Sequence, residues 1–266
     1  MKKTFRALLL LSAIAGLVGC ASGAMDGLPP ADQDAGAVFS EVGNPRDRAK
    51  AHTDLAAAYY GQGNMGVALE EIRQALSAES NYAPAYSLLA LVQMELRDNK
   101  RAEAAFERAL SINSKDADTN HNYAWFLCQN GREDESMRYF LAAIRNPLYS
   151  TPQKSYAQAG ICALRRKNEN DALDFFGKAL RLDANYLPAL INLAQLRYRR
   201  GELREARALI DRYNKISEPT AESLWLALRI ERRFGNVAAE NSYASQLRRR
   251  FAGSAEFQAM QKGRFE

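Results

Sequence analysis

Small and apolar residues recur along this chain at intervals of about 34 residues. In each interval three of them are separated by four and then three positions, which places them on one face of a helix. The three columns are Ala68, Ala102, Ser136, Ala172, Ala206 and Glu240; Ile72, Phe106, Phe140, Phe176, Ile210 and Ala244; and Ala75, Ala109, Ala143, Ala179, Tyr213 and Leu247. An upstream helix carries adjacent apolar or small pairs: Leu55-Ala56, Leu89-Ala90, Tyr123-Ala124, Ala159-Gly160, Leu193-Ala194 and Ala227-Leu228. The pattern predicts an all-α fold of repeated helix pairs.

A turn must separate the two helices of each pair, and a left-handed residue, commonly glycine, ends the first helix. The residues at that place are Gly63, Arg97, Gly131, Lys167, Gly201 and Gly235. This is the tetratricopeptide pattern, and it covers residues 46–250. It predicts six repeats, at about 49–82, 83–116, 117–152, 153–186, 187–220 and 221–250, of which the last is degenerate. Such repeats stack into a right-handed superhelix with a concave groove.

Two segments depart from the period. Two extra residues lie between repeats 3 and 4, within Asn146 to Pro152, where two prolines predict a stiff bend. Residues 251–266 contain Phe257, Met260 and Phe265. Because a solenoid needs a cap over its last apolar face, we expect a short capping helix there.

The N-terminus has the pattern of a secretory leader. A basic start precedes an apolar run from Ala7 to Val18, too short for a membrane span of ~20 residues. Leu17-Val18-Gly19-Cys20 resembles the bacterial lipobox, so we expect residues 1–19 to be removed and Cys20 to be acylated. The alternative is an ordinary leader with a chance cysteine. Ala21 in place of an aspartate favours the periplasmic face of the outer membrane.

Residues 20–45 are rich in Gly, Ala, Asp and Pro and show no sustained apolar period. They predict a flexible tether between the lipid and the repeats.

Charge offers no general reason to expect a nucleic-acid partner. The chain has 36 Lys and Arg against 31 Asp and Glu, and without the leader the counts are 33 and 31. Basic residues gather only near the C-terminus, at Arg229, Arg232, Arg233, Arg248, Arg249 and Arg250. They are interpreted either as a solvated terminal face or as a surface for an acidic partner.

Catalytic and cofactor chemistry is not expected. Gly61 to Gly66 match a dinucleotide-binding glycine spacing, but they follow a helix where that site needs a strand. His52 and His121 have no Cys or Glu spaced to join them in a metal site. No strained turn presents a nucleophile. The sequence therefore predicts a binding protein with no cofactor, metal or small-molecule substrate.

Cys128 and Cys162 are 34 residues apart, in first helices of neighbouring repeats. The periplasm is oxidising, so a disulfide is expected in preference to two buried free thiols. It would lock repeats 3 and 4 together.

A second stripe on the first helices, offset from the core columns, is expected to line the groove. It contains Tyr60, Leu91, Met94, His121, Trp125, Ile161, Tyr198 and Trp225. These side chains either contact adjacent repeats or bind an apolar segment of a partner. Trp125 and Tyr60 are the expected anchors, because aromatic side chains dominate binding energy at such sites.

Repeat 3 and the following insertion are more specific than the general repeat. The chain reads Asn120-His121-Asn122-Tyr123-Ala124-Trp125-Phe126-Leu127-Cys128, then Gly131-Arg132, and later Pro147, Tyr149 and Gly160-Ile161-Cys162. With the lipobox and six repeats, this resembles the type IV pilus biogenesis and stability lipoproteins, the pilotin-like PilW/PilF family.

The resemblance implies an outer-membrane lipoprotein that binds secretin subunits of a type IV pilus machine and promotes their localisation and multimerisation. A rival is a general outer-membrane repeat scaffold for β-barrel assembly or peptidoglycan enzymes, which would lack the repeat 3 pattern. A repeat-containing enzyme would need a catalytic domain, for which the residues outside the repeats leave little room.

Overall fold

The computed structural model describes residues 43–265, and within them every regular element is an α-helix. The helices are α1 (Pro45–Gly61), α2 (Met65–Ala78), α3 (Ala83–Glu95), α4 (Asn99–Ile112), α5 (Ala117–Gln129), α6 (Glu133–Arg145), α7 (Pro152–Arg165), α8 (Glu169–Leu182), α9 (Leu187–Arg199), α10 (Leu203–Ile216), α11 (Ala221–Phe234), α12 (Val237–Arg250) and α13 (Ala255–Gln261). No helix in that range is long and apolar enough to cross a membrane.

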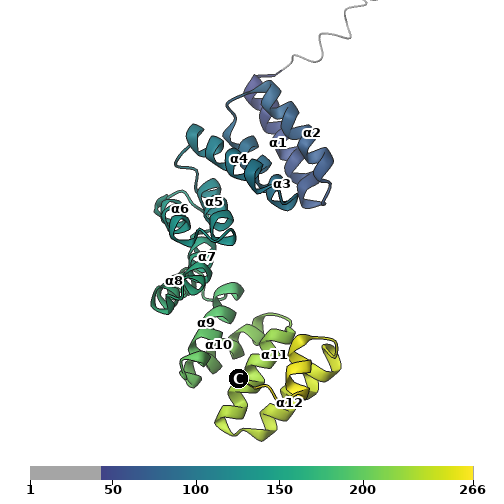
Figure 1. Cartoon of the computed structure of the whole chain (residues 1–266), viewed down its shortest axis with the longest axis vertical. Coiled ribbons are helices and arrows are strands. Elements are labelled where there is room, and N and C mark those ends of the chain that lie inside the picture. The colour runs from purple at the N-terminus through teal and green to yellow at the C-terminus, as the bar shows by residue number, and fades with distance from the viewer. Residues whose placement is uncertain (1–42, 266) are drawn as a thin grey trace, which may run out of the picture. The chain divides into compact units, whose positions relative to one another are not determined.

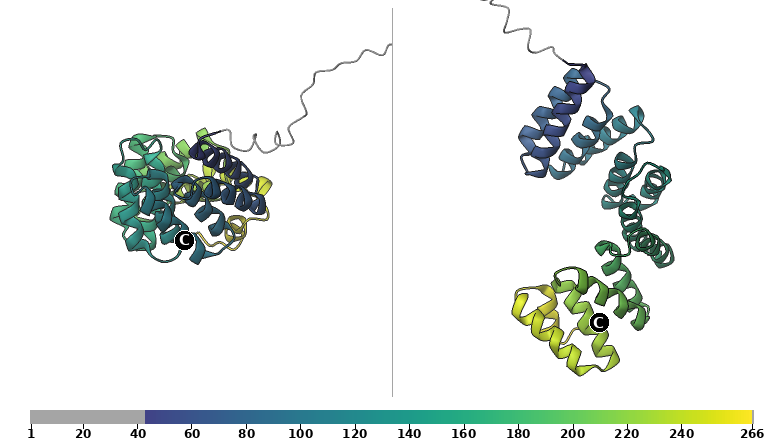
Figure 2. Two further views of the ribbon diagram at one scale, coloured as in Figure 1. Left: turned by 90° about the horizontal axis from the view of Figure 1, so that it is seen from above. Right: turned by 180° about the vertical axis from the view of Figure 1, so that it is seen from behind.

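The first twelve helices form six antiparallel pairs, and each pair packs on the next in chain order. Successive pairs change direction along the stack of residues 44–265, as Figures 1 and 2 show. The predicted right-handed superhelix of tetratricopeptide repeats is confirmed. α13 lies within the range expected for a capping segment and packs on α11 and α12.

The periodic columns form the core. Ala68, Ala102, Ser136, Ala172 and Ala206 are completely buried, and so are the rings of Phe106, Phe140 and Phe176. Small residues let the paired helices approach closely, since a Cβ at Gly160 would lie 2.6 Å from Phe176 Cε1. Leu55 belongs to the same pattern but is 43% exposed, because within residues 43–265 no repeat packs before α1.

The turns inside the pairs have the predicted backbone. All six turn positions have positive φ, from 78° at Gly63 and Gly131 to 60° at Arg97 and 59° at Lys167. Polar side chains then cap the N-terminus of the next helix. Asp98, for example, is the N-cap of α4 and accepts a hydrogen bond from the Arg101 amide.

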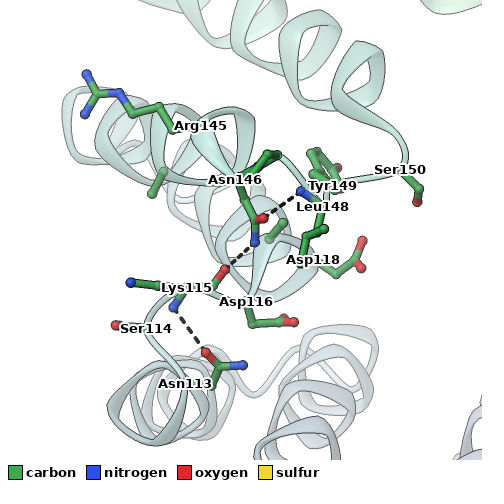
Figure 3. Close-up of a pocket in the computed structure, with 13 residues that line it drawn as sticks. Asn113, Ser114, Lys115, Asp116, Asp118, Arg145, Asn146, Leu148, Tyr149 and Ser150 are labelled. Atoms are coloured by element: carbon green, nitrogen blue, oxygen red, sulfur yellow. Dashed lines mark hydrogen bonds between the residues drawn. The ribbon is translucent and has the colours of Figure 1, made fainter.

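The insertion between repeats 3 and 4 is a loop held by Asn146 at its start. Asn146 Nδ2 donates to the Lys115 carbonyl over 2.8 Å, and the Leu148 amide donates to Asn146 Oδ1 over 2.9 Å (Figure 3). Tyr149 is buried, whereas Leu148 is 89% exposed. The loop therefore turns one apolar side chain inward and the other to solvent.

Candidate functional site: the concave surface

The concave surface is lined by the first helix of each pair. First helices of neighbouring repeats contact one another, from α1 with α3 to α9 with α11, whereas no two second helices of residues 43–265 are in contact. Because the first helices converge, they form the inner side of the superhelix. Helix-borne side chains on this side are held rigidly by the core behind them.

Six of the eight predicted groove residues are partly exposed on these helices: Tyr60, Leu91, Met94, Trp125, Ile161 and Tyr198. Each also packs against buried residues of its own or a neighbouring repeat. Both interpretations of the stripe therefore describe part of each side chain: one side contacts the core, and the other is open to solvent. Partner binding by these six residues stays a prediction.

The centre of the stripe combines an aromatic ring with a cation. The Arg165 guanidinium carbon lies 5.8 Å from the centroid of the Trp125 ring. Arg165 also donates to the Cys128 carbonyl over 3.0 Å, which fixes the guanidinium beside the ring. An indole held in this way loses little conformational freedom when a partner covers it.

The prediction that His121 lines the open groove is wrong. Its side chain is 3% exposed, and Nδ1 lies 2.7 Å from Ser155 Oγ, which lies 3.1 Å from the Tyr149 hydroxyl. The rings of Phe140 and Tyr149 enclose the imidazole. Burial, with a smaller effect from the charge of Lys154, lowers the pKa of His121 to about 3, so the ring is neutral. His121 is thus a core residue at the junction of repeats 3 and 4.

The prediction that Trp225 lines an open groove is also wrong. Trp225 is 8% exposed because the C-terminal segment covers it, with the Phe265 ring centroid 5.4 Å from that of Trp225. Sequence reasoning assigned Phe265 to the cap only. The sequence signal for this contact was an aromatic residue, Phe265, placed after the last helix, where the chain is free to turn back onto the concave surface.

Cys128 on α5 and Cys162 on α7 are joined in the structure, with their Cα atoms 5.9 Å apart. Both are fully buried beside Phe140 and partly buried Trp125. The link joins first helices of adjacent repeats directly behind the groove. That the pair is oxidised in the cell stays a prediction.

The described residues offer no arrangement suited to bond-breaking chemistry. Ser155 and His121 are within hydrogen-bonding distance, but both are buried, and Ser155 is completely so. No group of three or more His, Cys, Asp or Glu side chains between residues 43 and 265 could hold a metal ion.

An open cleft of about 780 Å³ lies elsewhere, between the loop before α5 and the loop before α7. Figure 3 shows Asn146 at its centre, hydrogen-bonded to Lys115 and Leu148. Its lining contains none of the predicted groove residues.

Comparison with known proteins agrees with this architecture. Three models of the tetratricopeptide repeat match residues 83–116, 105–138 and 163–228. The type IV pilus assembly protein PilF of Pseudomonas aeruginosa is 30% identical over 259 residues, which are 97% of this chain and 98% of that protein.

Solved structures give the same result. The crystal structure of PilW, a widely conserved type IV pilus biogenesis factor, superposes with a TM-score of 0.73 at 30% identity, covering 80% of this chain and 98% of PilW. A structure of Pseudomonas aeruginosa PilF gives 0.78 at 28% identity, covering 83% of this chain and all of that one. Because the relationship extends over nearly the whole length of its relatives, the chain belongs to the PilF/PilW family of type IV pilus biogenesis proteins.

Proposed function

We propose that this chain is a non-enzymatic outer-membrane lipoprotein that binds secretin subunits of a type IV pilus machine and promotes their localisation and multimerisation. The observation that carries the proposal is the 30% identity with a type IV pilus assembly protein along 98% of that protein's length. A match of this extent includes the repeats and the segment before them.

The concave surface would hold the secretin segment. Partly exposed aromatic and apolar side chains occur on α1, α3, α5, α7 and α9, so a helix or extended peptide could contact several repeats at once. Aromatic side chains supply much of the binding energy at such surfaces, which makes Trp125 and Tyr60 the proposed anchors. An apolar stretch held there is protected from aggregation before the ring assembles.

The junction of repeats 3 and 4 would keep this surface in its binding shape. The link between Cys128 and Cys162 and the buried pair of His121 and Ser155 join the same two first helices. A preorganised surface loses less entropy on binding than a flexible one.

Membrane attachment is proposed through Cys20, which lies outside the described residues. A single acyl chain gives only reversible membrane binding, whereas several chains anchor stably. We expect Cys20→Ala to leave the protein unprocessed or soluble. If that variant still fractionated with outer membranes, the lipid anchor would be wrong.

Site-specific crosslinking tests partner binding. A photoreactive amino acid placed at Met94 on α3, on the concave surface, should crosslink to the secretin in cells. The matched control is Glu107, exposed on the second helix α4 of the same repeat. Crosslinks from position 107 but not from position 94 would contradict binding by the concave surface.

A further inference from the structure

The C-terminal tail lies on the concave surface of the last two repeats. After α13 the chain reverses at Gly263, where φ is 65°. The Phe265 ring then packs beside Trp225 of α11, and its carbonyl oxygen is 3.5 Å from the Tyr198 hydroxyl of α9.

The tail tip contacts a different side of the cluster that α13 caps. Phe257, on α13, is 8% exposed and packs with Leu224, Leu228 and Leu247. That contact closes the apolar end of the last repeat. Phe265 packs on the same cluster through Trp225, on the groove side.

Arg229, on α11 beside these two rings, has no acidic partner among residues 43–265. The Arg229 guanidinium carbon lies 4.8 Å from the Tyr198 ring centroid and 5.4 Å from that of Trp225. Its Nε is buried without a hydrogen-bond partner, and no carboxylate within residues 43–265 forms an ion pair with it. A carboxylate that reached Arg229 would accept a charge-assisted hydrogen bond from this Nε.

Positive charge continues beside the tail. The Arg232 guanidinium carbon lies 3.9 Å from the Phe265 ring centroid, and Arg232 forms an ion pair with Glu240. An open cleft of about 470 Å³ is lined by Arg232, Gly263, Arg264 and Phe265. Arg233 and Arg264 form no ion pair with the acids that the structure describes. The site thus joins an aromatic platform to an excess of positive charge.

We propose that Tyr198, Trp225 and Arg229 form a docking site for a partner peptide carrying an aromatic side chain next to a carboxylate, which the chain's own tail covers until it is displaced. The tail places the Phe265 ring at this site, and Glu266 follows it in the sequence. The carboxylate of the incoming segment pairs with Arg229, and its ring replaces Phe265 on Trp225.

This inference rests on the proposed function in one respect, namely that a partner segment enters the concave surface. The tail competes as a tethered ligand, with an effective concentration of about millimolar for a short linker. A free peptide therefore binds the intact chain weakly, and loss of the tail contact raises its affinity.

The test uses the full chain, Phe265→Ala, and a fluorescent peptide with the sequence Gly-Ser-Glu-Phe-Glu-Ser-Gly. We expect Phe265→Ala to bind the peptide at least fivefold more tightly than the unchanged protein. Adding Arg229→Gln should abolish that gain, whereas adding Arg248→Gln, at an exposed arginine of α12, should not. Replacing both peptide glutamates by glutamine should also abolish it.

The proposal would be overturned if the unchanged protein and Phe265→Ala bound the peptide with equal affinity. It would also be overturned if Phe265→Ala bound the glutamine peptide as tightly as the glutamate peptide. Thermal melts check that each variant folds. If Phe265→Ala does not fold, the test is repeated with a chain that lacks residues 263–266 and keeps α13. Normal secretin multimers in cells lacking this protein would contradict the proposed function and leave the peptide result standing.

Discussion

A Cβ atom on Gly160 would lie 2.6 Å from Cε1 of Phe176, so α7 and α8 are in contact at a point where only glycine fits. Phe176 is completely buried and cannot move aside without disturbing the core.

Gly160→Ala should therefore destabilise the protein. The matched control is Gly177→Ala on α8, where the nearest atom to a new Cβ is the flexible end of Arg181 at 3.7 Å. Both substitutions replace a helical glycine by alanine and gain the same helix propensity. The difference in stability between the two variants therefore measures the clash with Phe176. We expect Gly160→Ala to be less stable than Gly177→Ala by about 1–3 kcal/mol in denaturant unfolding. Equal stability would mean that the two helices are farther apart.

Buried His121 should make the protein sensitive to acid. Its pKa is lowered to about 3 in the folded state, below the value of ~6.5 for an exposed histidine, so the unfolded chain binds the proton first. Its stabilising effect is complete above pH ~6.5 and is lost as the pH falls toward 3. Between pH 6 and 4 the free energy of unfolding should fall by about 2 kcal/mol more than in His121→Gln. Parallel pH profiles would show that the ring is accessible to water.

The link between Cys128 and Cys162 should be present in protein purified without reductant. Mass spectrometry of non-reduced peptides, after thiols are blocked at lysis, should recover the two cysteines in one crosslinked species. Closing a loop of 34 residues contributes about 3–4 kcal/mol in the chain-entropy model, so reduction should lower stability by that amount. The double variant Cys128→Ala/Cys162→Ala should not respond to reductant. Two blocked thiols would disprove the link.

Trp125→Ala should weaken secretin capture more than it weakens the fold, because part of the indole faces the groove. We expect capture to fall about 5- to 30-fold, the range for an aromatic anchor worth about 1–2 kcal/mol. Leu141→Ala, on second helix α6 and 37% exposed, is the control and should bind normally. A melting temperature lowered by several degrees with capture intact would make Trp125 a core residue.

The repeated part of the fold could be predicted because one physical pattern determines it. Residues 34 apart meet equivalent neighbours, so buried Ile72 predicts buried Phe106, and the turn at Gly63 predicts the left-handed Arg97. The same spacing separates His121 from Ser155, as it does the two cysteines.

What could not be predicted depends on segments outside the period. Tyr149 encloses His121 because the insertion loop folds inward, and Phe265 covers Trp225 because the tail reverses at Gly263. Neither contact follows from helical spacing. A composition-based reading of the tail identifies its apolar residues but not the surface on which each one packs.

The central proposal is that this protein promotes assembly of the pilus secretin in the outer membrane. The direct measurement is a gel of outer-membrane fractions, run without boiling, from cells with and without this protein and probed for the secretin. We predict that large multimers vanish or move to the inner membrane in its absence while the monomer persists. Multimers of unchanged amount and location would contradict the account.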